Sequence, residues 1–225
     1  MDLKYLRFSA FNKLKKPFST WARLRRMEQL VGMFNLRPGM CVLDLGGTPD
    51  IWSYPCIPAL NVTILNLPGH IKKTAASRHN LRYIEGDGCN VEGVGDQSFD
   101  FVFSNSVIEH VGGPERRRAF ANEIRRIGRA YWVQTPSIWF PIEAHNGMPF
   151  WWAYPQSVRQ ALIERWRKSL PEWTEMVEGT TVVKRSELES LFPEARIIVE
   201  RVLDIPKSYS AVYAPRAAGT SDRLH

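Results

Sequence analysis

The sequence lacks the features of several specialised protein classes. Its three cysteines, Cys41, Cys56 and Cys89, follow neither a disulfide framework nor the spacing of a metal site. No apolar run approaches the roughly 20 residues that cross a bilayer, and charged residues interrupt the N-terminus where a secretion signal would be apolar. We therefore expect a cytoplasmic protein with reduced thiols and no metal site. The 225 residues, 44% hydrophobic and 24% charged, are typical of one globular domain over 1–225.

The chain has more basic than acidic residues, with a formal net charge of +7. One interpretation is a surface that binds nucleic acid or an anionic membrane; the other is solvated helix faces, because most of these residues lie at helical spacing beside apolar ones. The sequence has no RNA-recognition or helix-turn-helix motif, which argues against nucleic acid. For the basic N-terminal segment, 1–39, contact with an anionic membrane and closure over a site both stay open. The clusters are Lys13, Lys15, Lys16, Arg23, Arg25 and Arg26; Arg116 to Arg118, Arg125, Arg126 and Arg129; and Arg165, Arg167 and Lys168.

Short apolar strands alternate with amphipathic helices along the chain. This alternation predicts right-handed βαβ units and therefore an α/β fold, a Rossmann-like, mostly parallel seven-stranded sheet with helices on both faces. We expect a core over 40–135, a Trp-rich helical insertion over 136–183, a helix with closing strands over 184–215, and a flexible tail over 216–225. The predicted strands are 41–45, 62–65, 81–85, 99–103, 130–134, 195–203 and 208–214, and the helices are 18–35, 114–128 and 184–192, with a short or irregular helix within 48–60.

Polar residues stand at the ends of four successive predicted strands: Asp44, Asn66, Asp87 and Asn105. Ligands of such sheets bind beyond the carboxyl ends of the strands. After Asp44 the chain turns through two glycines into Thr48-Pro49-Asp50, which places bulk and negative charge where a dinucleotide would need to seat its pyrophosphate. The pattern therefore favours a nucleoside ligand that carries positive charge and no phosphate.

In this order, the motifs resemble those of the class I methyltransferases that use S-adenosylmethionine, in particular their small-molecule branch. The resemblance is good over 40–135 and loose over 136–215. Val42 to Gly47 is similar to the family's first motif, although Pro49 or Asp50 stands where the family has a third glycine. Ser104 to Val111 is very close to the family's fourth-strand segment.

The resemblance implies S-adenosylmethionine as cofactor and assigns its binding residues. Asn66 takes the place of the family's acidic residue on the ribose hydroxyls, and Asp87 that of the carboxylate on the adenine amino group. The implied cofactor-binding residues are Asp44, Gly46, Gly47, Thr48, Asn66, Leu67, Asp87, Gly88, Asn105 and Ser106.

Two histidines are candidates for the catalytic base of methyl transfer to a hydroxyl group. His145 follows the fifth strand into the insertion, and Glu143 stands where it can orient the ring. A catalytic base and a structural, hydrogen-bonded histidine are both open interpretations of His145. For His110 a structural role is favoured.

The insertion is rich in aromatic residues. Trp139, Phe140, Trp151 and Trp152 are candidates for lining the acceptor pocket, and packing within the core of the insertion is the alternative. We expect both uses, because so short an insertion must bury something to be stable.

These observations predict methyl transfer to a small-molecule acceptor at a hydroxyl oxygen, with glycans and lipid-linked molecules among the candidates. One alternative is an RNA methyltransferase, although Ser104 to Val107 stands where base-methylating enzymes carry their tetrapeptide. The other is a non-catalytic binding protein that retains the fold. The oligomeric state does not follow from the sequence.

Overall fold

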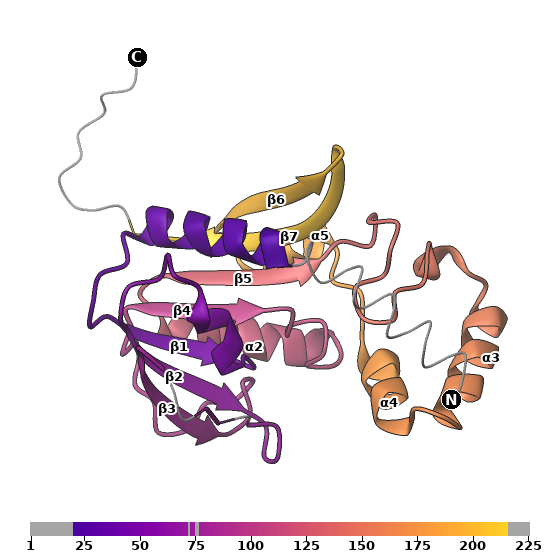
Figure 1. Ribbon diagram of the computed structural model, residues 1–225, viewed down its shortest axis with the longest axis horizontal. Coiled ribbons are helices and arrows are strands. Elements are labelled where there is room, and N and C mark those ends of the chain that lie inside the picture. The colour runs from indigo at the N-terminus through magenta and orange to yellow at the C-terminus, as the bar shows by residue number, and fades with distance from the viewer. Residues whose placement is uncertain (1–19, 72, 75–76, 216–225) are drawn as a thin grey trace.

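The computed structural model describes residues 20–71, 73–74 and 77–215, which build an α/β fold around a seven-stranded sheet (Figure 1). The strand order is β3-β2-β1-β4-β5-β7-β6. β1 to β5 are mutually parallel and β7 runs antiparallel to both of its neighbours, so the predicted mostly parallel sheet is confirmed. The strands are β1 (Cys41–Leu45), β2 (Asn61–Asn66), β3 (Asn80–Glu85), β4 (Phe101–Asn105), β5 (Tyr131–Pro136), β6 (Arg196–Val202) and β7 (Ile205–Tyr213).

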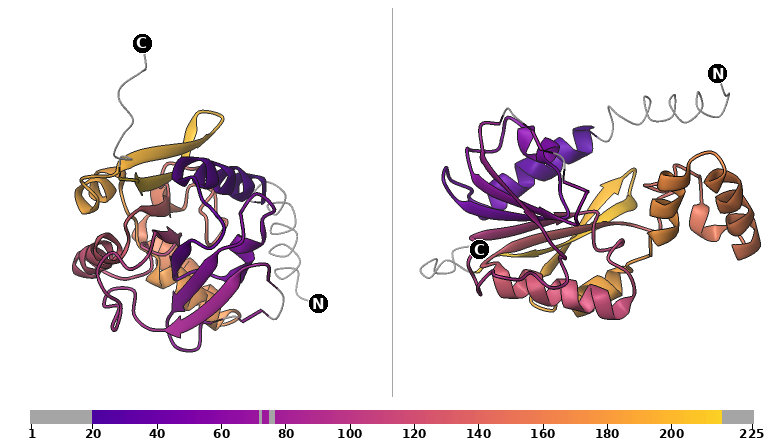
Figure 2. Two further views of the ribbon diagram at one scale, coloured as in Figure 1. Left: turned by 90° about the vertical axis from the view of Figure 1, so that its left-hand side faces the viewer. Right: turned by 90° about the horizontal axis from the view of Figure 1, so that it is seen from below.

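Alternate residues of β1 enter two separate cores, as the period of a strand requires. Leu43 and Leu45 pack with α2 (Pro114–Ile127) and α5 (Arg185–Leu191) on one face of the sheet. Val42 packs on the other face against the helix over residues 20–34. Figure 2 shows the sheet between these two layers, so the prediction of helices on both faces is confirmed.

The fourth strand begins two residues later than predicted. Phe99 forms only an isolated bridge with Gly128, and regular pairing with β1 begins at Phe101. The sequence pattern places Phe99 in the strand because its side chain is apolar. Its backbone, however, is not part of the continuous pairing between β1 and β4. β7 begins three residues earlier than predicted, at Ile205, and the other predicted strands and helices agree with the structure to within about two residues over the part that it describes.

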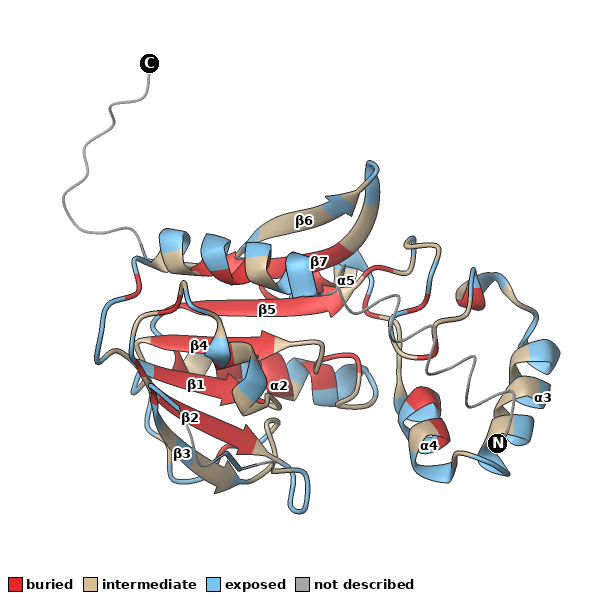
Figure 3. Cartoon of the chain, in the orientation of Figure 1, coloured by how far each residue is buried: buried red, intermediate tan, exposed pale blue. Residues whose placement is uncertain are grey.

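α3 (Gln156–Arg167) and α4 (Pro171–Gly179) lie beyond the carboxyl ends of the central strands (Figures 1 and 2). They are joined by tryptophan packing: Trp166 stacks on Trp151 of the 3-10 turn η2 (Trp151–Ala153), with ring centroids 5.5 Å apart, and meets Trp173 of α4 at 5.1 Å. The central strands are buried, whereas α3 is largely exposed (Figure 3). We refer to residues 137–180 as the cover.

No helix in the described part of the chain is both long and apolar enough to span a membrane. Three lysines of the N-terminal basic cluster, Lys13, Lys15 and Lys16, and the tail over 216–225 lie outside the described residues.

Candidate active site

A cavity of about 440 Å³ lies where β4 and β5 end and the cover begins. The sheet order reverses between β1 and β4, so the cavity lies beside the switch point, at the carboxyl edge where ligands of parallel sheets bind. Its lining combines charged, polar and aromatic side chains. Among the lining residues are Arg26, Asn105, Ser106, Glu109, Thr135, Phe140, Ile142, Glu143, His145, Trp152, Thr180 and Lys207.

Glu143 and His145 form a hydrogen-bonded pair on the cavity wall, with side chains that are 5% and 12% exposed. The Nδ1 atom of His145 lies 2.8 Å from Oε1 of Glu143. The second carboxylate oxygen accepts hydrogen bonds from the backbone N–H groups of His145 and Asn146 at 2.7 and 2.6 Å. The loop over 143–146 therefore wraps around the Glu143 carboxylate. The contact between Oε1 of Glu143 and Nδ1 of His145 orients the imidazole ring, as the sequence predicted.

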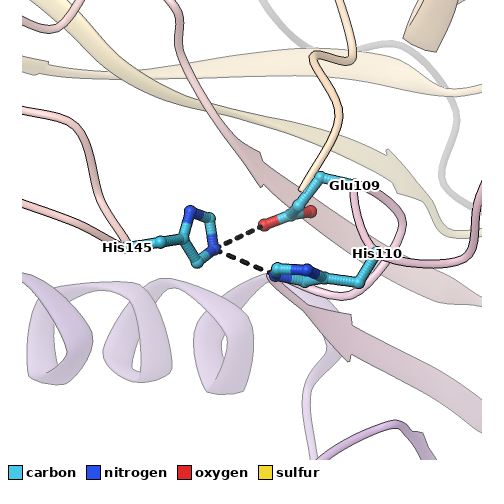
Figure 4. A group of neighbouring side chains, drawn as sticks. All are labelled: Glu109, His110 and His145. Carbon is cyan, nitrogen blue, oxygen red and sulfur yellow. Dashed lines mark hydrogen bonds and ion pairs between the residues drawn. The ribbon is translucent and has the colours of Figure 1, made fainter. Parts of the chain in front are cut away.

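The Nε2 atom of His145 points at Glu109 and His110 (Figure 4). It lies 3.0 Å from Nε2 of His110 and 3.7 Å from Oε1 of Glu109. Each of these three residues offers one ligand atom, and the three atoms lie within 4.8 Å of one another, so the group could hold a metal ion. We refer to Glu109, His110 and His145 as the His–Glu cluster.

Burial dominates the electrostatics of this cluster. Loss of solvent raises the pKa of Glu109 to about 7. Burial, and next the neighbouring His145, lower the pKa of His110 to about 4, so that its ring is neutral at physiological pH. Burial works in the opposite direction at Glu143, yet the hydrogen bonds and charge of His145 hold the pKa of Glu143 below its usual range.

A network of charged side chains forms another part of the wall. Arg26, from the helix over 20–34, donates a hydrogen bond to Oδ1 of Asn105 and pairs with Glu200 at 2.6 Å. Lys207 of β7 pairs with the same Glu200 carboxylate at 2.6 Å. The network ties the first described helix to β4, β6 and β7.

Asp44 is fully buried beneath the loop that follows β1. Its Oδ2 atom accepts a hydrogen bond from the indole Nε1 of Trp52 at 2.8 Å, and no other described residue hydrogen-bonds to Oδ1. Burial raises the pKa of this carboxyl to about 7. Among the described residues, Trp52 is therefore the hydrogen-bond donor beside Asp44.

The glycines after β1 let their loop pack onto neighbouring side chains. Gly46 has a φ of +75°, and a Cβ atom there would lie 2.6 Å from Val107. A Cβ atom on Gly47 would fall 1.9 Å from the Asp44 carboxylate. Glycine is therefore required here by close internal packing. Thr48 follows in an extended conformation and leads into the 3-10 turn η1 (Pro49–Ser53).

The ends of β2 and β3 carry the residues that the sequence predicts to contact the nucleoside. The Nδ2 of Asn66 lies 3.3 Å from the Gly47 carbonyl oxygen and joins the loops after β1 and β2; Leu67 beside it is 49% exposed. Asp87 pairs with Arg116 through both carboxylate oxygens, at 2.8 and 2.9 Å. Burial alone would raise the pKa of Asp87, but hydrogen bonds from the Cys89 N–H and Arg116 lower it. At Gly88 a Cβ atom would lie 2.7 Å from Phe120.

The loop after β4 connects the carboxyl edge of the sheet to the cavity. Ser106 has a φ of +56°, and its hydroxyl donates to Oε1 of Gln134 at 2.9 Å. Ser106 and Asn105 both line the cavity.

The four predicted acceptor aromatics divide between two environments. Phe140 and Trp152 line the cavity, whereas Trp151 is 4% exposed and packs within the cover. Trp139 is 73% exposed. Two of these aromatic residues therefore line the cavity, and one packs within the cover.

Sequence reasoning assigned no role to Glu109, Thr135 or Thr180. The signal for Glu109 was a carboxylate beside a histidine in an otherwise apolar stretch. Arg26 gave no separate signal, because it resembled the other basic residues of its helix.

The segment over 54–130 matches the family model described as "Methyltransferase domain". No curated protein sequence matches the chain.

Similar solved structures include the magnesium protoporphyrin IX methyltransferase of Synechocystis with bound S-adenosylhomocysteine, at 11% identity and TM-score 0.52, covering 95% of both chains. A Rhodobacter sphaeroides protein described as a zinc-dependent alcohol dehydrogenase has 14% identity and TM-score 0.56, over 82% of this chain and 88% of its own. A methyltransferase of Aquifex aeolicus has 16% identity and TM-score 0.47, over 91% and 96%.

At these identities the solved structures support the fold alone, and the family match adds the class, a methyltransferase domain. The chain therefore carries a methyltransferase domain over 54–130, and its α/β fold is similar to that of the Synechocystis methyltransferase with bound S-adenosylhomocysteine.

Proposed function

We propose that the enzyme transfers the methyl group of S-adenosylmethionine to a hydroxyl oxygen of a small molecule bound in the 440 Å³ cavity. The observation that carries the proposal is the hydrogen-bonded Glu143–His145 pair on the wall of this cavity, at the carboxyl ends of β4 and β5. A cavity of this size suits a small molecule or one ring of a larger acceptor.

The residues at the carboxyl edge of β1 to β4 fit the methyl donor in their chemistry. β1 and the loop after β3 supply carboxylates, Asp44 and Asp87, and Asp44 keeps a buried oxygen to which no other described residue hydrogen-bonds, which suits a cationic ligand. Bound S-adenosylmethionine supplies an electrophilic methyl group on its sulfonium. The residues proposed to hold it are Asp44, Gly46, Gly47, Thr48, Asn66, Leu67, Asp87, Gly88, Asn105 and Ser106.

The acceptor would lie among the aromatic and polar side chains that line the cavity. Phe140 and Trp152 offer aromatic faces that suit a sugar ring or an apolar tail. His145 is the side chain that activates the acceptor hydroxyl, and Glu143 positions its ring. Holding the hydroxyl oxygen in line with the methyl group supplies much of the remaining catalysis.

The His145→Ala variant tests this proposal. We expect turnover to fall by about 100-fold or more, with little change in the affinity for S-adenosylmethionine, because His145 lies on the acceptor side of the cavity. Turnover is measured as S-adenosylhomocysteine release with a panel of hydroxylated small molecules, and product mass spectrometry locates the added methyl group. Titration calorimetry gives the donor affinity.

His70→Ala is the matched control, since His70 is an exposed histidine outside the cavity lining, and it should retain turnover. Full turnover by His145→Ala, or a methyl group found on nitrogen or carbon of the acceptor, would contradict the proposed function.

A further inference from the structure

The His–Glu cluster directs three ligand atoms from two segments of the chain toward one point (Figure 4). Glu109 and His110 come from the loop after β4, and His145 comes from the cover. Glu109 is 1% exposed, and no described residue donates a hydrogen bond to its Oε1 atom. A buried carboxylate oxygen without a donor is costly, so this atom indicates that a partner belongs beside it.

We propose that Glu109, His110 and His145 bind a divalent transition metal ion of the zinc type. Two imidazoles and one carboxylate are a donor set of catalytic zinc sites. Tetrahedral bonds of about 2.0–2.1 Å separate neighbouring ligand atoms by roughly 3.3 Å. The separations from Nε2 of His145, 3.0 Å to His110 and 3.7 Å to Glu109, lie on either side of that value. Small rotations of the side chains complete the site.

Each of the three ligands has an outer partner that orients it. Glu143 holds Nδ1 of His145 at 2.8 Å, which is the carboxylate–histidine arrangement found behind zinc ligands. The Thr180 hydroxyl lies 3.3 Å from Nδ1 of His110. The Thr135 hydroxyl donates to Oε2 of Glu109 at 3.1 Å, which leaves Oε1 for the metal. With these contacts the Nε2 atoms of both rings face inward.

The inference rests on the proposed function and specifies how the hydroxyl is activated. Three protein ligands leave a fourth position, and Glu109 and His145 both line the cavity in which the acceptor is proposed to bind. A metal ion there lowers the pKa of the acceptor hydroxyl. The O–H bond breaks and its proton passes to water; the O–C bond then forms as the S–C bond of the donor breaks. His145 serves in this reaction as a metal ligand.

Metal binding by the full chain tests the site. Protein stripped with a chelator is titrated with Zn²⁺ by calorimetry and with Co²⁺ by absorption spectroscopy. We expect one ion per chain, an affinity at least 100-fold lower in His110→Ala and in His145→Ala, and about 10- to 100-fold lower in Glu143→Gln. The Glu143→Gln variant keeps the shape of the side chain, so it reports on the site even if the alanine variants fold poorly.

His70→Ala controls for ions held by an exposed histidine and should bind as the wild type does. Failure of the wild type to bind Zn²⁺ and Co²⁺, unchanged affinity in Glu143→Gln, or a Co²⁺ spectrum of thiolate ligation would overturn the metal site.

Methyl transfer with and without chelator separates this inference from the proposed function. Hydroxyl methylation that depends on His145 in a chain without bound metal would overturn the metal site and leave the function standing. One bound ion in an enzyme that methylates no hydroxyl would overturn the function and leave the site.

Discussion

Asp44 illustrates, at the scale of single residues, how a buried carboxylate constrains both packing and charge. Its carboxylate lies so close beneath Gly47 that a side chain there would clash with it. Its one hydrogen-bond donor among the described residues is the Trp52 indole, and burial raises its pKa to about 7. The folded protein therefore binds a proton at this position more tightly than the unfolded chain does.

Asp44→Asn should change how stability depends on pH. In the wild type, raising the pH from about 4 to about 7 ionises Asp44 in the unfolded chain first, so the free energy of unfolding falls across this window. The contribution is up to about 4 kcal/mol, because each pKa unit corresponds to about 1.4 kcal/mol. Urea unfolding at a series of pH values should show that the asparagine variant lacks this component.

Asp96→Asn removes a carboxylate whose side chain is 78% exposed and serves as the control. It should reproduce the wild-type pH profile. Parallel profiles for the wild type and Asp44→Asn would show that Asp44 ionises in the folded protein as it does in water.

The cover is a separate packing unit at the scale of secondary-structure elements. Trp166 of α3 contacts Trp151 and Trp173, which lie on η2 and α4. The main cores on either side of the sheet contain none of these three tryptophans. Stability of the cover thus depends on its own aromatic contacts.

Trp166→Ala should loosen the cover and leave the sheet intact. Two aromatic pairs are lost, at about 0.5–1.5 kcal/mol each. Hydrogen exchange should show reduced protection over 151–179 and unchanged protection in β1 and β4. Val158→Ala, at an exposed position of the same helix, should leave both unchanged; loss of protection throughout the sheet in Trp166→Ala would show that the cover and the sheet unfold together.

Charge is distributed over the whole molecule in a way that argues against an RNA-binding surface. All six arginines of the cluster in and after α2 form ion pairs: Arg116 with Asp87, Arg117 with Glu187, Arg118 with Glu115, Arg125 with Glu194, Arg126 with Glu123 and Asp96, and Arg129 with Asp100. Phosphate binding would have to compete with these carboxylates. The net charge of +7 therefore overstates the positive field of this face.

We expect RNA to bind weakly and without the steep salt dependence of a phosphate-binding surface. An electrophoretic shift assay between about 50 and 200 mM salt measures this dependence. A tight, salt-sensitive complex would favour the RNA methyltransferase alternative over a small-molecule acceptor.

Local patterns predicted the strands of the sheet well, because the apolar residues of a strand themselves indicate that it is buried. Val42 to Leu45 is apolar apart from Asp44, and the structure buries all four. The Glu143–His145 contact was also predictable, since two residues on one loop cannot lie far apart. Phe99 shows the limit of such patterns: its apolar side chain suggested a strand, whereas ladder pairing depends on the neighbouring chain.

By itself the sequence determined the class of fold, the carboxyl edge at which ligands bind and the methyltransferase motifs, because these depend on local periodicity and short segments. Only the tertiary structure decided which residues meet across long sequence separations. It brought Glu109 and His110 against His145 and placed the Trp52 indole where it donates a hydrogen bond to Asp44. It also divided the aromatic residues between the cavity and the cover. The physical reason is that these contacts depend on how loops from different strands cross at one edge of the sheet, which no local pattern encodes.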